Sequence, residues 1–204
     1  TGHLVLSTIH TNDAVGTIPR LVDMGVEPYL ISPVLILSMA QRLVRTLADG
    51  QGEEFSISPS EKRNIEEQLS SLPSKYRFKV PEKAWEPMRT PTSPTGLRGR
   101  MAVFEVLEMS QEVERIILDN PVGSRLWASA RTDGMLTMQE DALVKAFNKL
   151  IPFSEVNTLS QLLSGGGDIT DTGGVEADKI DVAGSSKTTP KTDGSKNATD
   201  PIVQ

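Results

Sequence analysis

The chain has 204 residues, which suits one large domain or two small ones. Its 21 Lys and Arg against 27 Asp and Glu leave a formal net charge of −6, and this acidic balance argues against nucleic acid as the main partner. The chain has no cysteine and two histidines, which excludes disulfides and thiolate metal sites and leaves too few ligands for a typical structural zinc site.

The first predicted elements are a strand and a helix. Residues 4–6 read Leu-Val-Leu, a short apolar run typical of a buried parallel strand. Residues 11–13 read Thr-Asn-Asp and offer capping side chains, and the apolar spacing over 14–22 predicts a helix that ends near Gly25. Pro19 is awkward inside this helix, because proline removes a backbone hydrogen bond and can cause a kink.

A second helix is predicted from Pro28 to about Ala40. Residues 41–47 either extend this helix or form a strand, and their periodicity leaves both open. The apolar stretch 30–40 is shorter than the roughly 20 residues that span a bilayer, so it is expected to lie in the core.

Residues 50–95 differ from their surroundings, since they contain six of the 13 prolines. They are predicted to be an insertion between two parts of one core, and residues 60–72 within them resemble a short charged helix that Pro73 ends.

The remaining residues predict a strand at 101–107 and then four short helices. Ser110 caps the first, the second closes before Gly134, a capping box that begins at Thr137 opens the third, and the fourth spans about 154–163. Strands followed by helices indicate an α/β core with a small helical cap. The core is expected to hold Trp127 and Phe147, while Glu105 either pairs with an arginine or faces water.

Residues 164–204 are rich in glycine, Ser, Thr and acidic residues and contain no aromatic residue. Such a segment buries too little apolar surface to offset its chain entropy, so it is predicted to be a disordered tail.

The segment with the clearest chemistry is residues 1–13, TGHLVLSTIHTND, where the predicted strand ends in polar side chains. In open α/β sheets, ligands bind beyond the carboxyl ends of the strands. There the His10 imidazole could donate a hydrogen bond to a phosphate oxygen, beside the amide donors of a helix N-terminus. The alternative is that His10 caps or packs at the strand end, and the chemistry alone leaves both open.

This segment resembles the histidine box of the type II secretion and type IV pilus assembly ATPases. Four later stretches agree with that family in order, namely LVDMGVEPYL (21–30), AQRLVR (40–45), TGLRGR with VFEVL (95–107), and Gly134-Met135 with EDAL (134–143). The resemblance covers about residues 1–160, and the insertion resembles the pilus-extension branch.

The resemblance implies an α/β fold, the C-terminal part of a RecA-like P-loop ATPase core with a small C-terminal helical subdomain. Residues 1–49 would end the core and carry the histidine box, and residues 50–95 would replace the zinc loop of the family. Residues 96–163 would form a strand and the helical subdomain, and 164–204 the disordered tail.

The zinc-holding cysteines of the family align with positions where this chain has Ala48, Gln51, Arg89 and Thr92. None of these side chains offers a thiolate, so no zinc is expected.

The resemblance makes His10 the catalytic histidine, placed to contact or sense the γ-phosphate. Three polar side chains would support it, and three arginines are candidates for contacts across a subunit boundary, with exposed salt-bridging arginines as the alternative. These residues are Thr8, Thr11 and Asn12, and Arg42, Arg98 and Arg100.

The resemblance further implies a cytoplasmic motor that is a homo-hexamer. It would be peripheral at the inner membrane, where it would bind the platform of a pilus or secretion machine. The intact parent would use ATP and Mg²⁺ and would have no nucleic acid partner. The 204 residues contain no G-x-x-x-x-G-K-S/T phosphate loop, so this chain alone is expected to be inactive. The alternative function is a non-catalytic oligomerisation or assembly module derived from such an ATPase.

Overall fold

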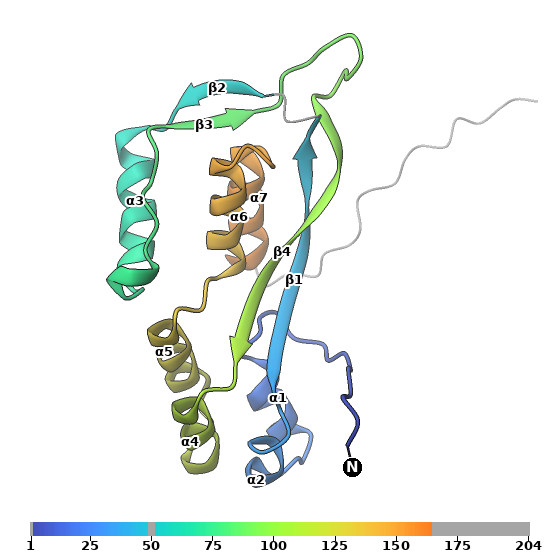
Figure 1. The fold of residues 1–204 in the computed structure, drawn as a ribbon, viewed down its shortest axis with the longest axis vertical. Helices are drawn as coiled ribbons and strands as arrows, with labels where there is room; N and C mark the ends of the chain where they lie inside the picture. The colour runs from blue at the N-terminus through green and yellow to red at the C-terminus, as the bar shows by residue number, and fades with distance from the viewer. Residues whose placement is uncertain (1, 49–51, 165–204) are drawn as a thin grey trace, which may run out of the picture. The chain divides into compact units, whose positions relative to one another are not determined.

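The computed structural model describes residues 2–48 and 52–164 of the chain (Figure 1). In these two stretches the chain forms, in order, α1 (Thr17–Asp23), α2 (Pro28–Ile31), β1 (Leu37–Leu47), β2 (Glu53–Ser56), α3 (Pro59–Ser70), β3 (Lys83–Glu86), β4 (Leu97–Glu108), α4 (Gln111–Asp119), α5 (Gly123–Asp133), α6 (Met138–Phe147) and α7 (Phe153–Ser164). The mixture of helices and strands is consistent with the predicted α/β class. Of the predicted tail, only Ser164 lies within the described residues, where it ends α7.

The central feature is an antiparallel ribbon of β1 and β4. Its register runs from Leu37 opposite Glu108 to Arg45 opposite Arg100, and it shifts before Leu47. Side chains alternate between the two faces of a ribbon, and one face here carries the buried Val103. The predicted strand at 101–107 is therefore confirmed, and β4 extends beyond it at both ends.

The predicted helix over residues 28–40 is wrong beyond its first turn. Helix α2 ends at Ile31 and β1 already begins at Leu37, so residues 41–47 take the strand alternative. Pro33 cannot donate the hydrogen bond that would continue the helix. Beyond it, pairing with β4 outweighs the local preference of an apolar run that suits either structure.

The predicted parallel strand at residues 4–6 is also wrong. Leu4, Val5 and Leu6 are 75 %, 78 % and 89 % exposed and belong to an irregular segment that leads into α1 (Figure 1). A strand needs a neighbour to pair its backbone groups. Both sheets within residues 2–48 and 52–164 are two-stranded and antiparallel, and neither takes in this segment.

Helix α1 resolves the difficulty with Pro19. The helix begins at Thr17, so Pro19 is its third residue, where a backbone N–H has no acceptor within the helix and none is lost. After the helix, Gly25 adopts a φ of +87° and donates its N–H to the carbonyl of Val22 at 2.9 Å. The predicted glycine at the helix end is confirmed.

The four predicted C-terminal helices are confirmed, together with their capping residues. The hydroxyl of Ser110 accepts the N–H of Val113 at 3.3 Å, and Thr137 forms the predicted capping box with Glu140. Gly134 ends α5 in the left-handed conformation, with a φ of +99°. Short local signals therefore determine where these helices begin and end.

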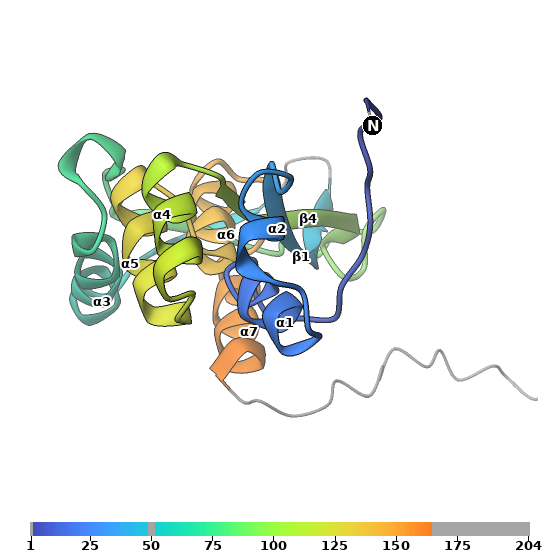
Figure 2. The ribbon, with the colours of Figure 1, turned by 90° about the horizontal axis from the view of Figure 1, so that it is seen from below.

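Residues 53–86 share an apolar core with the C-terminal helices. Strands β2 and β3 pair as a hairpin, and a capping box of Ser58 and Glu61 starts α3. Figures 1 and 2 show α6 and α7 between α3 and the β1–β4 ribbon. The core that these elements share includes Ile57, Ile65, Leu69, Val80, Met138, Leu143 and Phe153.

Two aromatic side chains lie differently from one another. Phe147 packs at the edge of this core, with its ring centroid 6.2 Å from that of Phe78. Trp127 is 36 % exposed on α5, so its predicted place in the core is wrong.

A second apolar core joins α1 and α2 to α4, α5 and one end of β4; it includes Ala14, Ile18, Ile31, Leu107, Val113, Ile117 and Leu126.

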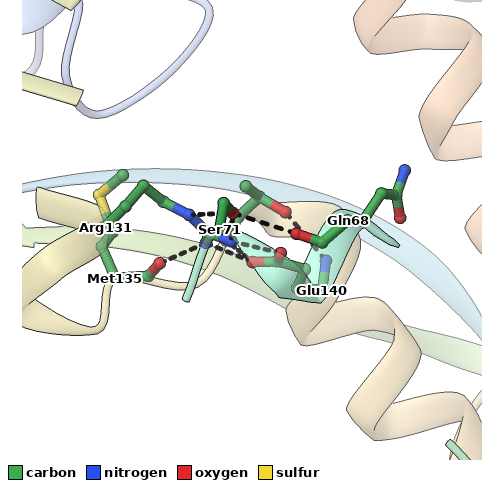
Figure 3. Close-up of polar contacts among 6 residues, drawn as sticks. Gln68, Ser71, Arg131, Met135 and Glu140 are labelled. Carbon is green, nitrogen blue, oxygen red and sulfur yellow. Dashed lines mark hydrogen bonds and ion pairs between the residues drawn. The ribbon is translucent and has the colours of Figure 1, made fainter. Parts of the chain in front are cut away.

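A buried ion pair joins α5 to α6 and reaches the end of α3 through Ser71 (Figure 3). The Arg131 guanidinium meets the Glu140 carboxylate through two hydrogen bonds of 2.6 and 2.7 Å. It also donates to the carbonyl of Met135 at 2.6 Å and to the hydroxyl of Ser71 at 2.8 Å. Ser71 follows α3 and donates in turn to the carbonyl of Gln68 at 3.1 Å. The pair is thus supported by hydrogen bonds from two other parts of the chain.

None of the helices within residues 2–48 and 52–164 combines the length and apolar character needed to cross a membrane.

Candidate functional site

The candidate site is built on residues 2–16, which we call the histidine segment. Residues 2–8 are exposed, and the side chains of Thr8, His10 and Asn12 all face solvent. Thr11 is half-buried and donates its hydroxyl to the carbonyl of Asp13 at 3.0 Å. The His10 imidazole therefore stands exposed just before the first residues of the segment that are fixed.

The segment becomes fixed at Asp13 and Ala14. The Asp13 carboxylate accepts the N–H of Gly16 at 2.6 Å and so closes the turn that precedes α1. The side chain of Ala14 is fully buried, and its N–H donates to Oε1 of Glu105 on β4 at 2.9 Å. One further bond comes from β1, where the hydroxyl of Ser38 donates to that of Thr17 at 2.8 Å. Both strands of the ribbon thus hold the turn that follows His10.

Glu105 is a site residue whose role the sequence left open. It is only 3 % exposed, so the expectation that it faces water is wrong, and its direct partner is a backbone amide rather than an arginine. Burial raises the pKa of this carboxyl group, and the charge of Asp13 adds to the effect. The N–H groups of Ala14 and Met138 and the charge of Arg131 act in the opposite direction.

A signal for the burial of Glu105 was present in the sequence. Glu105 alternates with Val103 and Leu107, and side chains at every second residue of a strand share one face. Its partner Ala14 lies 91 residues away, and no local pattern predicts such a contact.

The ribbon brings Arg42 near the histidine segment. Arg42 pairs with Val103 and lies on the same face as the adjacent cross-strand pair of Ala40 and Glu105. Residues two apart on a strand are separated by about 7 Å, so Arg42 is the next residue along this face from the anchor of the segment. It is half-buried and donates to the carbonyl of Gln41 at 3.2 Å.

The structure does not bring Arg98 and Arg100 to His10. They lie near the start of β4, and Arg100 is five residues, or about 17 Å, along the strand from Glu105. Arg100 faces Arg45 across the ribbon, and Arg45 pairs with Glu155 of α7 at 2.7 Å. The carbonyl of Arg98 accepts the hydroxyl of Thr46. A contact of either arginine across a subunit boundary stays a prediction.

Three of the four positions aligned with the zinc ligands of the family lie within the described residues. Ala48 is buried, Arg89 and Thr92 are exposed, and Gln51 lies outside the described residues. Over residues 2–48 and 52–164, no three His, Cys, Asp or Glu side chains form a group that could hold a metal ion. The expected lack of zinc stays a prediction.

Compared with known protein families and proteins, the sequence matches one family over most of its length. The family model described as "Type II/IV secretion system protein" matches residues 1–158. Type II secretion system protein E of Xanthomonas campestris is 39 % identical over 156 residues, which cover 76 % of this chain and 26 % of that relative. The type IV pilus assembly ATPase PilB of Thermus thermophilus is 34 % identical over 158 residues, which cover 76 % and 17 %. Type II secretion system protein E of Pectobacterium carotovorum is 36 % identical over 157 residues, which cover 76 % and 29 %. The chain therefore spans less than a third of the length of each of these relatives.

Proposed function

Because the chain belongs to the type II/IV secretion system protein family, as its motifs predicted, we propose that it is the C-terminal part of a hexameric ATPase that powers type IV pilus assembly or type II protein secretion. The observation that carries this proposal is the exposed His10 imidazole, which precedes a turn fixed by both strands of the ribbon. The names of the relatives, which include a type IV pilus assembly ATPase, supply the reaction class.

In this proposal His10 contacts or senses the γ-phosphate of ATP, and Thr8, Thr11 and Asn12 add polar groups beside it. Phosphoryl transfer depends mainly on positioning and on stabilising the charge that develops on the transferred group. An imidazole N–H just before a fixed turn is suited to that task, and its exposure leaves it free to meet a ligand.

The proposal assigns the remaining chemistry to other parts of the polypeptide and to neighbouring subunits. The phosphate loop and the Mg²⁺ site would lie outside these 204 residues, which contain no G-x-x-x-x-G-K-S/T sequence. Residues 1–49 would then end a RecA-like core. Arg42, Arg98 and Arg100 would contact the neighbouring subunit of a homo-hexamer, where the planar guanidinium suits phosphate or carboxylate partners.

The proposed setting is the cytoplasmic face of the inner membrane, where the motor would act on the platform of a pilus or secretion machine. In this proposal the chain binds other proteins rather than nucleic acid, in keeping with its net charge of −6. The second candidate function is a non-catalytic assembly module, and the lack of a phosphate loop within the 204 residues is the observation that favours it.

ATP turnover by the full-length gene product distinguishes the two functions. We expect His10→Ala to lower kcat by about 100-fold while the KM for ATP stays within about twofold, because a group that acts on the developing charge affects the transition state most. His3→Ala is the matched control, since His3 is an exposed histidine of the same segment. A full-length protein that assembles but has no turnover supports the assembly module, and unchanged turnover in His10→Ala removes His10 from the mechanism.

A further inference from the structure

We propose that Glu105 is a positioning residue for the histidine segment: its carboxylate fixes the backbone at Asp13 and Ala14 on the ribbon and so holds His10 in place for the hydrolysis step. The catalytic consequence rests on the proposed function, whereas the anchoring can be measured in the 204-residue chain by itself.

The histidine segment has few other anchors. Residues 2–8 are exposed, and Thr11 and Asp13 bond to residues of the same short stretch, apart from a contact of 3.5 Å between the hydroxyls of Thr11 and Thr17 at the start of α1. Two described hydrogen bonds reach the turn from the ribbon, one from Glu105 to Ala14 and one from Ser38 to Thr17. Glu105 provides the one nearer to His10, four residues after the imidazole. Together with the burial of Ala14 and Val15 in the second apolar core, this contact fixes the backbone that follows His10.

Glu105 also connects the segment to the helical part of the chain. The backbone N–H of Met138, the first residue of α6, favours the charged form of the same carboxylate. Its cross-strand neighbour is Ala40, which packs against both apolar cores. One side chain of β4 thus holds the turn after His10 and faces the start of α6.

The choice of a carboxylate here is costly for stability. Burying a charge is unfavourable, and the raised pKa of Glu105 shows that burial outweighs the hydrogen bonds it receives. A glutamine could accept the same N–H without that cost. The contact with Ala14 therefore depends on an acceptor at this position rather than on its charge. An acceptor kept at a cost to stability fits positioning better than stability.

The first test measures how the amide proton of Ala14 exchanges with solvent in the 204-residue chain. Glu105→Met keeps the length of the side chain but loses the acceptor, whereas Glu105→Gln keeps an acceptor. We expect Ala14 to exchange about tenfold faster or more in Glu105→Met and within about threefold of the wild type in Glu105→Gln, while Ile117 in α4 is unchanged.

Glu155→Met is the matched control, because Glu155 is also buried and accepts a backbone N–H, that of Arg45, at 2.9 Å. It removes a backbone contact of the same kind, together with the ion pair between Glu155 and Arg45, away from the segment and should leave Ala14 unchanged. The proposal is overturned if Glu105→Met leaves the exchange of Ala14 within about threefold of the wild type, or if Ala14 and Ile117 accelerate equally. Should Glu105→Met not fold, Glu105→Ala takes its place under the same criteria.

The second test uses ATP turnover by the full-length gene product. We expect Glu105→Met to lower kcat about tenfold or more with little change in KM, because small displacements of a catalytic group are costly for the chemical step. Glu105→Gln should recover most of this loss, and Glu155→Met should show none. Faster exchange at Ala14 with unchanged kcat would overturn the positioning role. If the wild type has no turnover, the proposed function fails while the exchange experiment still decides the anchoring.

Discussion

The two ends of the described chain obtain their structure in different ways. Helices α4, α5 and α6 begin or end at local signals, and α4 to α7 bury apolar side chains against one another and the ribbon. The histidine segment has one apolar run, at residues 4–6, and it stays exposed. Its fixed part, from Asp13 onward, is held by side chains that β1 and β4 supply. The proposed chemistry therefore lies where local sequence determines structure least.

The largest effect on stability is expected where the helical part is fastened to α3. Arg131→Met would leave the Glu140 carboxylate buried without its partner, and breaking such a pair costs about 3–5 kcal/mol. Urea unfolding of the 204-residue chain measures this loss. The double variant Arg131→Met/Glu140→Gln, which keeps an acceptor for the capping box, should recover more than half of it. A loss below about 1 kcal/mol in the single variant would show that the pair does not fasten these helices.

A smaller loss is expected at the end of α5. Gly134 has a φ of +99°, and a Cβ there would lie 2.6 Å from the ring of Tyr76. Gly134→Ala should therefore cost about 2 kcal/mol or more from backbone strain and the clash. Gly123→Ala is the control, because its Cβ would meet nothing within 4 Å. Equal thermal midpoints for the two variants would contradict this account of the turn.

The next prediction concerns pH and the anchor of the histidine segment. The pKa of Glu105 is raised by burial and by the charge of Asp13, against the opposing charge of Arg131. The pKa of Glu105 is higher in the folded state than in the unfolded state. Between these two values the folded state binds more protons, so the contribution of Glu105 to stability is lost as pH rises. Glu105→Gln, which cannot ionise, should therefore gain stability relative to the wild type as the pH rises from about 4 toward neutral. Urea midpoints across this range measure the difference, and a gain by the wild type would contradict the assigned burial.

The smallest effect is expected in the exposed part of the histidine segment. Leu6 is 89 % exposed, so Leu6→Ser should change the free energy of unfolding by less than about 0.5 kcal/mol. Val113→Ser replaces a fully buried side chain of α4 and serves as the contrast, with an expected loss of several times that amount. A large loss from Leu6→Ser in the 204-residue chain would show that this run is packed and would remove the contrast between the two regions.

The contrast also explains which predictions succeeded. The caps at Ser110 and Thr137 and the glycine at 134 depend on neighbours within a few residues, so the sequence alone located the C-terminal helices. The run after Pro33 suits a helix or a strand equally, and its pairing with β4, about 60 residues away, decided the outcome. The sequence identified His10 and its polar neighbours as a candidate site. It could not show that Glu105 holds the turn after His10, because that contact joins residues 91 apart. It also could not show that Arg42, alone of the three arginines, lies near Glu105, because this follows from the register of β1 and β4.

The central claim, that His10 acts on the developing charge of phosphoryl transfer, is tested most directly by comparing two ligands of the full-length protein. ADP represents the ground state, and ADP with aluminium fluoride and Mg²⁺ imitates the transferred phosphoryl group. The account predicts that His10→Ala binds ADP as the wild type does and binds the fluoride complex about 100-fold more weakly. Equal affinities of the wild type and His10→Ala for both ligands, or an equal loss for both, would contradict it.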